Sequence, residues 1–270
     1  MNARRNRGTA LLMVVWLIVL LAGLLAGYAL TARVEHLQGR QVAAQAIAGQ
    51  AARAGIEYAV ARLSDADPGR RWLPDGSVHE LPFAAATLQV AVRDESGKVD
   101  LNAAAPELLS AFFAVFGADR PQADRLAAAI VDWRDADNLV QVGGGAEDGD
   151  YRAAGLPYGA KDAPFETVEE LRQVLGMTDA LFEQAAPYLT VHTGRAVPDP
   201  AWADPPVLSA SGQQALAAPP AGGGSGTYSI DSTAQLADGR SAQLSVLLRV
   251  GGNGLPGSTY TPLRWGAGSR

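Results

Sequence analysis

The hydrophobic pattern is strongest near the N-terminus, where residues 9–30 form one uncharged run behind the basic leader MNARRNRG. A helix of this length reaches about 33 Å, enough to cross a hydrocarbon core. Arginines precede the run and no comparable cluster follows at once, so the positive-inside bias predicts a cytoplasmic N-terminus and places residues 31–270 across the membrane. The pattern predicts a single-pass anchor with an exported bulk.

A cleaved signal peptide is a weaker interpretation of the same run. Such a peptide has an apolar region of about 7–15 residues followed by a small-x-small cleavage site. The run here is longer, and Gly27-Tyr28-Ala29 is a poor site. A plain membrane anchor remains open from the run alone.

Helical periodicity continues to residue 64, with no proline before the turn-forming segment 64–69. We predict one helix over 9–64, of which the second half is amphipathic. The apolar face predicted for this half comprises Val34, Leu37, Ile47, Ala51, Ala54, Tyr58 and Ala61.

Alternating patterns mark strands at both ends of the remaining chain. Residues 87–93 alternate and are preceded by a possible hairpin arm at 72–83, within a first strand region at 65–93. Residues 227–270 contain two further alternating runs joined around Asp238-Gly239, a hairpin signal. The simplest topology is one antiparallel sheet interrupted by a helical insertion over 94–193.

Helix-start signals recur within the insertion. Asn102 or a near neighbour is the expected N-cap of a helix with Pro106 in its first turn, and a second helix is expected over 124–134. Thr167 and Glu170 form a capping box that opens a helix over 167–175, and Thr178 or Asp179 opens the next. Residues 194–226 are rich in Pro, Ala and Gly, and we expect a flexible linker there.

Charge and composition separate the insertion from the rest. Residues 94–191 carry 18 acidic and 7 basic side chains, a net charge of −11, whereas the leader is basic. The chain has no cysteine, so its exported part must be stable without disulfides.

The junction of Gly8 and Thr9 resembles the prepilin leader of type IV pilins and type II secretion pseudopilins. That resemblance implies that prepilin peptidase cuts after Gly8 and that the new N-terminus at Thr9 is methylated. Most members carry Glu at the fifth position after the cut, but this chain has Met13. A buried ammonium without a counter-charge is costly, so a subunit lacking this Glu suits the tip of a filament, where no neighbour lies ahead.

The runs GKVDLN, IVDWRDADN, GAEDGDY and APFETVEELRQVLGM resemble, in order and spacing, the general secretion pathway protein K family of minor pseudopilins. The resemblance implies an α+β, type IV pilin-like fold, a long N-terminal helix on an antiparallel sheet, with a large inserted α-helical domain. It also implies a place at the pseudopilus tip with I- and J-type minor pseudopilins, in the inner membrane with a periplasmic bulk, where the protein supports export across the outer membrane.

The family is also associated with calcium, and the acidic loop permits that interpretation. Calcium takes about 6–8 oxygen ligands from carboxylates, amides, carbonyls and water. The candidate ligands are Asp135, Asp137, Asn138, Glu147, Asp148 and Asp150. Leu139 and Val140 stand where an EF-hand would need a ligand and a glycine, so this is not an EF-hand. A merely solvated acidic loop is the alternative.

A DNA-binding protein is a second functional class. The insertion also resembles helix-hairpin-helix modules, which hold phosphates through basic groups and a Gly-x-Gly turn. The turns at Gly117 and Gly176 lack the second glycine, and a net charge of −11 repels phosphate. We expect no nucleic-acid partner.

An enzyme is the third class. The three histidines, His36, His79 and His192, are scattered, there is no cysteine, and no Gly-x-Ser-x-Gly motif occurs. Asp132 could suggest an acid/base site, but we expect its neighbours Trp133 and Arg134 to serve as a core residue and an ion-pair partner. We expect no catalysis.

Overall fold

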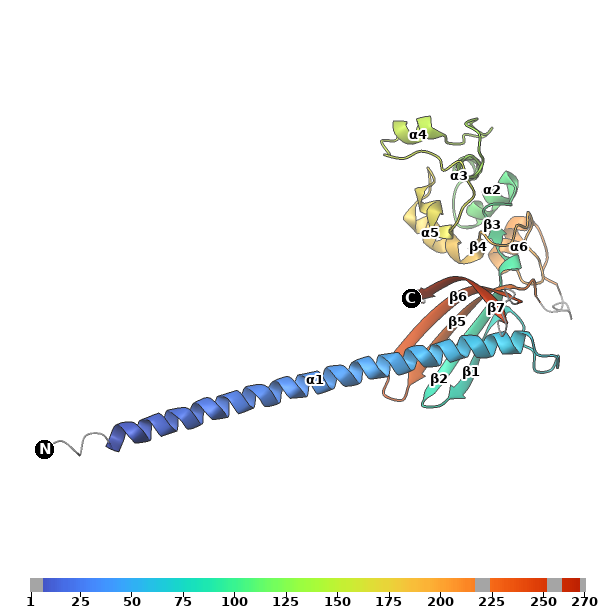
Figure 1. The fold of residues 1–270 in the computed structure, drawn as a ribbon. Coiled ribbons are helices and arrows are strands. Elements are labelled where there is room, and N and C mark those ends of the chain that lie inside the picture. The colour runs from blue at the N-terminus through green and yellow to red at the C-terminus, as the bar shows by residue number, and fades with distance from the viewer. Residues whose placement is uncertain (1–6, 217–223, 252–258, 268–270) are drawn as a thin grey trace.

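One long helix organises the molecule. The structure is a computed structural model that describes residues 7–216, 224–251 and 259–267; for 7–9, 29–40 and 267 only the backbone is described. Helix α1 (Arg7–Leu63) has 57 residues and is therefore about 85 Å long. Its N-terminal half stands clear of the rest of the molecule and its C-terminal half lies on a sheet (Figure 1). The long helix predicted over 9–64 is confirmed.

The sheet has five antiparallel strands in the order β1-β2-β5-β6-β7. They are β1 (Asp75–Phe83), β2 (Ala86–Asp94), β5 (Thr227–Leu236), β6 (Ser241–Val250) and β7 (Tyr260–Ala267). The central neighbours β2 and β5 pair in register from Ala86↔Leu236 to Asp94↔Tyr228, although more than 130 residues separate the end of one from the start of the other. The predicted single antiparallel sheet with a helical insertion is confirmed.

The core between α1 and the sheet is built from small residues on the helix and branched residues on the strands. Ala48, Ala52 and Ile56 are fully buried against Val90 and Ile230. The predicted amphipathic face is wrong in part, because Ile47 and Tyr58 are exposed and only Ala51 of that set is buried. The helix is so rich in alanine that periodicity alone does not distinguish its two faces. The side chains of Val34 and Leu37 lie outside the described residues.

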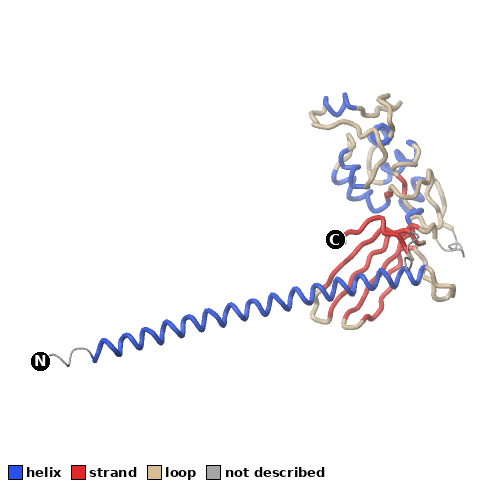
Figure 2. The backbone as a smooth tube through the Cα atoms, viewed as in Figure 1, coloured by secondary structure: helices blue, strands red, loops and turns tan. Residues whose placement is uncertain are grey.

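The insertion forms a second body with its own core at the end of the molecule remote from the N-terminus (Figure 2). Between the first and last of its helices, β3 and β4 pair in parallel, and Val99 lies opposite Leu189. The helices and strands of the insertion, with 3₁₀ helices labelled η, are η1 (Glu95–Gly97), β3 (Val99–Asp100), α2 (Pro106–Val115), α3 (Arg120–Arg134), α4 (Asp148–Ala153), η2 (Val168–Gln173), α5 (Asp179–Ala185), η3 (Ala186–Tyr188), β4 (Leu189–Thr190) and α6 (Pro205–Ser211).

Two details of the insertion differ from expectation. Asn102 is not an N-cap: its side-chain oxygen accepts from the Phe165 N–H at 2.7 Å and its amide donates to the Phe165 carbonyl at 2.9 Å, which ties together segments far apart in the chain. The segment opened by the Thr167–Glu170 capping box is a short 3₁₀ helix rather than an α-helix. Pro106 does occupy the first turn of α2, as predicted.

The flexible linker predicted over 194–226 is wrong for its first half. Helix α6 forms there, and Val207 is fully buried in the insertion core. The Asp199 N–H also donates to the Ser96 carbonyl at 2.8 Å. Proline at the first turn of α6 favours helix initiation, so a proline-rich composition was compatible with order. Residues 217–223 lie outside the described residues.

Candidate functional site

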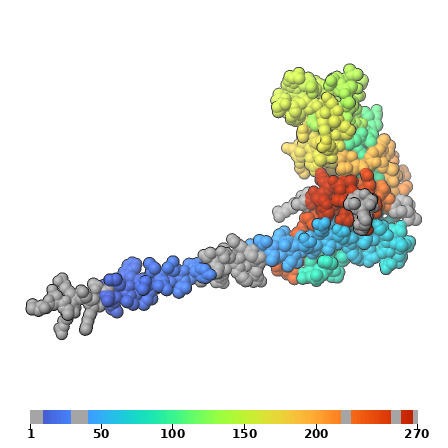
Figure 3. Space-filling model, in the orientation of Figure 1, coloured from blue at the N-terminus to red at the C-terminus, as the bar shows by residue number. Residues whose placement is uncertain are grey.

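The apolar span is the first candidate site. Residues Ala10–Tyr28 make the one helix segment in the described residues that is long and apolar enough to cross a membrane, with mean hydropathy 2.7. None of the span is buried inside the molecule (Figure 3). Met13 lies within it and is 70% exposed. Gly8 and Thr9 lie in the first turn of α1, and the leader before Arg7 lies outside the described residues.

The acidic loop is the second candidate site, and it is held between two helices. Helix α3 ends at Arg134, whose guanidinium donates to the carbonyls of Leu101 and Ala104, so the predicted ion-pair role of Arg134 is wrong. The loop then runs to α4, whose start is fixed by Asp150 accepting from the Glu147 N–H at 3.0 Å. Trp133 is buried in the core, as expected. Both ends of the loop are therefore fixed.

Three of the six predicted ligands come together. Carboxylate oxygens of Asp135, Asp137 and Glu147 all lie within 4.8 Å of one another. Glu147 is only 6% exposed, and neither of its carboxylate oxygens has a hydrogen-bond partner within the described part of the chain. One buried oxygen of Asp135 is likewise unpaired there. Buried polar groups are normally hydrogen-bonded, so these oxygens are suited to a positively charged partner.

The other three predicted ligands do not join this cluster. Asp150, at the third position of α4, accepts from the N–H of the N-cap residue Glu147, and Asp148 lies against Gly159. Asn138 is exposed. Sequence reasoning from composition could not separate these roles, because all six residues lie in the same Gly-rich stretch.

Asp132 was not among the predicted ligands, but its charge acts on Glu147 and the structure places it beside the cluster. This carboxylate is fully buried and accepts from the Gln141 N–H at 3.1 Å. A Cβ at Gly145 would lie 2.0 Å from its Oδ2, so only glycine allows the loop to fold onto it. Asp162, on a separate segment and with a positive φ of 52°, adds negative charge toward Glu147. No pattern in the sequence indicates that Asp132 or Asp162 lies close to Glu147.

Burial and mutual repulsion raise the pKa values of two carboxyl groups in and beside the cluster, Glu147 and Asp132. Burial raises the pKa of Glu147 to about 7, with the negative charges of Asp132 and Asp162 adding to the effect. Burial also raises the pKa of Asp132 to about 6, against the hydrogen bonds from Gln141 and Ala146. The part of the shift that comes from neighbouring carboxylates reflects repulsion that a bound cation would relieve.

The residues present fit a calcium ion. Calcium–oxygen distances are 2.3–2.6 Å, so ligand oxygens spaced within about 5 Å of one another can share one ion. Asp135, Asp137 and Glu147 would hold it, and backbone carbonyls of the loop and water would complete the shell. Bound there, calcium would neutralise the unpaired carboxylates and fix the loop to α4.

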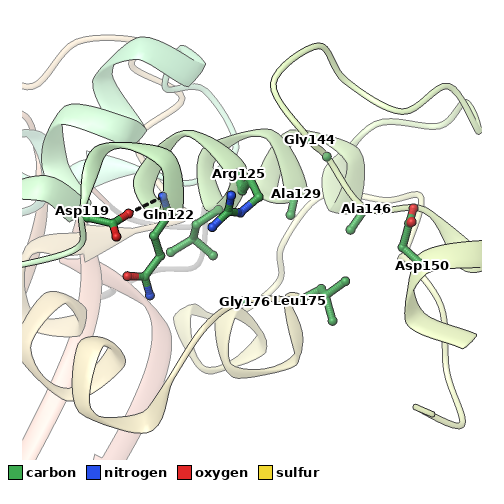
Figure 4. Close-up of a pocket in the computed structure, with 11 residues that line it drawn as sticks. Asp119, Gln122, Arg125, Ala129, Gly144, Ala146, Asp150, Leu175 and Gly176 are labelled. Atoms are coloured by element: carbon green, nitrogen blue, oxygen red, sulfur yellow. Dashed lines mark hydrogen bonds between the residues drawn. The ribbon is translucent and has the colours of Figure 1, made fainter. Parts of the chain in front are cut away.

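A cavity of about 440 Å³ adjoins this loop. Figure 4 shows it between α3, the loop segment of Gly144 and Ala146, and the turn at Gly176. Asp119 and Asp150 lie at opposite ends, and Arg125 provides the cation in the lining. The mixed charges do not select one ligand class.

The helix pairs that suggested DNA binding do form. The turn between α2 and α3 contains Gly117 and the turn before α5 contains Gly176, both with positive φ. Acidic side chains flank them: Asp119 caps α3, and Asp179 lies in the first turn of α5. The absence of a nucleic-acid partner stays a prediction, as does the absence of catalysis. His79 stacks on Trp72 at 3.8 Å between ring centroids, a packing role.

Comparison with known proteins points to one family. The family described as Type II secretion system (T2SS), protein K, matches residues 87–194, from β2 to just after β4, and leaves out α6 of the insertion core. Type II secretion system protein K of Pectobacterium carotovorum subsp. carotovorum is 27% identical over 207 residues, covering 68% of this chain and 62% of the relative. The protein of the same name from Klebsiella pneumoniae is 31% identical over 129 residues, 46% of this chain and 39% of the relative. The chain therefore spans less than two thirds of the length of these relatives.

The fold agrees with this family. A chain from the crystal structure of the GspK-GspI-GspJ complex of the enterotoxigenic Escherichia coli Type 2 Secretion System superposes with a TM-score of 0.60. The alignment covers 88% of this chain and 99% of that one, at 17% sequence identity, which shows a shared fold. Sequence similarity across residues 87–194 and a shared fold both relate this chain to the type II secretion system protein K family.

Proposed function

We propose that this protein is a minor pseudopilin that caps the tip of the periplasmic pseudopilus together with I- and J-type minor pseudopilins and thereby supports protein export across the outer membrane. Its apolar span would anchor it in the inner membrane with the N-terminus in the cytoplasm. One observation carries the proposal: the bulky insertion stands at the end of the molecule remote from the span (Figure 1).

The position of the insertion explains why it would cap a filament. The insertion leaves the sheet at Asp94, the end of β2, and returns at Thr227, the start of β5. Subunits that enter from the membrane would lie alongside α1, whereas the insertion occupies the space beyond the sheet. Met13 supports the same placement, since it offers no carboxylate to the N-terminus of a subunit ahead.

Co-purification tests this function. The tagged full-length chain would be co-expressed with I- and J-type minor pseudopilins and extracted from membranes in detergent. We expect both partners to be retained at constant ratio through size-exclusion chromatography. Recovery of the chain alone, or its recovery from the periplasm without residues 1–30, would contradict the proposal.

Processing by prepilin peptidase is a separate part of the proposal. Replacing Gly8 with Ala should leave the leader attached, while the unmodified chain should begin at Thr9 with a methylated amine. Mass spectrometry of the intact protein from strains with and without the peptidase measures both. The same mass in the two strains would contradict cleavage.

Calcium binding by Asp135, Asp137 and Glu147 is the third part. The buried, unpaired oxygens of Asp135 and Glu147 support it. Isothermal titration of the full-length chain with calcium, and with magnesium as a control, should show calcium binding that is lost in Glu147→Gln. Magnesium requires a near-octahedral shell, so it should bind more weakly. Equal, weak heats for both ions would contradict the site.

A further inference from the structure

The chain enters and leaves the insertion through two segments that meet beside the end of the sheet (Figure 1). The entry segment comprises residues 94–100, and the exit segment comprises residues 189–202 and 224–228. We call the place where they meet the neck. A Cβ at Gly97 would lie 2.2 Å from the Trp202 carbonyl oxygen, so the two segments touch there without room for a side chain between them.

A buried carboxylate, that of Asp94, connects the two segments where they leave the sheet. Asp94 is the last residue of β2 and is 2% exposed. One of its oxygens accepts from the Ser96 N–H at 2.8 Å and from the Ser225 hydroxyl at 2.6 Å. The other accepts from the Ser225 N–H at 2.5 Å. Hydrogen bonds to an ionised group are stronger than neutral ones, so this one side chain holds the entry segment and the exit segment together.

The exit segment approaches Asp94 so closely that only glycine fits beside it. A Cβ at Gly224 would lie 2.0 Å from Asp94 Oδ2 and 2.7 Å from a ring carbon of Tyr228. Tyr228 is the residue of β5 that pairs with Asp94 across the sheet. The glycine therefore allows the exit segment to reach the carboxylate just before the chain re-enters the sheet.

A second buried carboxylate joins the same two segments on the insertion side of the neck. Asp100, at the end of β3, is 1% exposed. One of its oxygens accepts from the Thr193 N–H at 2.9 Å, the Thr193 hydroxyl at 2.8 Å and the Gly194 N–H at 2.8 Å. Asp100 therefore holds the two segments together within the insertion, whereas Asp94 holds them at the sheet.

Two other contacts between the insertion and the sheet are weaker. The Lys98 ammonium lies 3.5 Å from the Ser229 hydroxyl, at the limit of a hydrogen bond. The pair of Arg264 and Glu169 is about half exposed, and exposed pairs of this kind contribute little. Asp94 is the strongest of these three links.

We propose that Asp94 is a clasp that fixes the direction in which the insertion projects from the sheet. Its three hydrogen bonds tie the end of β2 to η1 on one side and to the exit segment on the other. Without them the insertion would swing about the neck while each core stayed folded, since Asp100 would still hold the two segments together within the insertion. This role is a property of the single chain and does not rest on the proposed function.

Proteolysis measures the opening of the neck, because the only lysines of the chain are Lys98, in the neck, and Lys161, in the insertion. The bond after Lys98 leads into Val99, which is fully buried, so endoproteinase Lys-C cuts there only when the neck opens. In the full-length chain in detergent, Asp94→Asn should speed cleavage at Lys98 on the order of tenfold, because it removes hydrogen bonds to a charged group and cleavage follows the open population. Cleavage at Lys161 should keep its rate, since this site lies within the insertion itself.

A glycine variant and a matched control separate the clasp from a general loss of fold. Gly224→Ala leaves the carboxylate in place but pushes the exit segment away from it, so it should also speed cleavage at Lys98. Asp231→Asn removes a carboxylate of β5 that likewise accepts from a serine hydroxyl, that of Ser245, and it should change neither rate. Equal acceleration at both lysines in Asp94→Asn would mean that Asp94 stabilises the whole insertion, and an unchanged rate at Lys98 would mean that other contacts hold the neck. Either result would overturn the proposal.

A distance measurement between spin labels tests the swinging motion itself. The chain has no cysteine, so Val78→Cys on β1 and Glu107→Cys on α2 can be labelled at two exposed positions. Electron–electron double resonance should give one narrow distance distribution in the otherwise unmodified chain and a broad one when Asp94→Asn is added. A distribution that stays equally narrow with Asp94→Asn would overturn the clasp, whatever the cleavage rates.

Discussion

The two cores of this protein differ in the kind of buried polar group that they leave without a hydrogen bond. Between α1 and the sheet, the buried residues are overwhelmingly apolar, and the buried polar exceptions include Ser232 and Thr227. The insertion is equally well packed around Phe112 and Leu109 but adds the acidic cluster with its unpaired carboxylate oxygens. The α1–sheet region leaves a neutral hydroxyl, Ser232 Oγ, without a hydrogen-bond partner in the described part of the chain, whereas the insertion leaves carboxylate oxygens of Asp135 and Glu147 unpaired there. If the proposed calcium site exists, cations should therefore act on the insertion and leave α1 and the sheet unaffected.

The largest expected effects test whether the two cores are independent. Phe112→Ala should cost the insertion about 3–5 kcal/mol, and Ile56→Ala should cost the α1–sheet core about 2–5 kcal/mol, since both side chains are fully buried. Calorimetry of the full-length chain in detergent should show two transitions, each lowered by only one of the variants. A single transition lowered equally by both would mean that the regions unfold together.

Calcium should stabilise only one of the two regions. At a free calcium concentration one hundred times the dissociation constant, the insertion should gain about 2.7 kcal/mol, because binding to the folded state alone stabilises it. Glu147→Gln should abolish this gain. The α1–sheet transition should not move with calcium, and an equal shift of both transitions would contradict the contrast.

The response to pH should also be confined to the insertion. Without calcium, the folded state keeps protons that the unfolded chain releases, because the pKa of Glu147 is raised to about 7 and that of Asp132 to about 6. The stability of the insertion should therefore fall as pH rises from about 4.5 to 7 and level off above that range. Melting in a chelator at pH 5 and pH 7.5 measures it, and Glu147→Gln should reduce the fall to the part that Asp132 contributes. A profile that rises with pH would contradict the assigned environment.

Substitutions at two glycines of α1 test how closely the helix packs on the sheet. A Cβ at Gly55 would lie 2.3 Å from Ser232 Oγ and 3.0 Å from a methyl of Val90, whereas one at Gly49 would meet nothing within 4 Å. Gly55→Leu should therefore destabilise this core by about 1–3 kcal/mol, and Gly49→Leu should be neutral or slightly stabilising in a helix. Equal unfolding midpoints for the two variants would show that helix and sheet are less closely packed than described.

The smallest expected effect concerns the link between the two regions. Arg264 on β7 donates to both oxygens of Glu169 at 2.9 and 2.8 Å, and both side chains are about half exposed. A double-mutant cycle with Arg264→Ala and Glu169→Ala should give a coupling of about 0.2–1 kcal/mol that weakens with salt. A coupling well above this range would indicate that the two regions are more firmly joined.

The features that the sequence could and could not predict also differ between the α1–sheet region and the insertion. Strands such as β2, which alternates buried and exposed positions, were predictable, whereas no alternating run predicted β7. The buried face of α1 was not predictable, since alanine occupies both faces. Composition located Asp135, Asp137 and Glu147, but Asp132 belongs to a helix and Asp162 to a distant segment. Which carboxylates meet depends on tertiary packing that a linear pattern does not contain.

Hydrogen exchange of the full-length chain with and without calcium tests the contrast between the regions most directly. Calcium should increase protection within residues 135–150 and at the adjoining end of α3, while residues 48–60 of α1 and strand β2 should exchange at unchanged rates. Unchanged exchange across residues 135–150, or equal protection of both regions, would contradict the account.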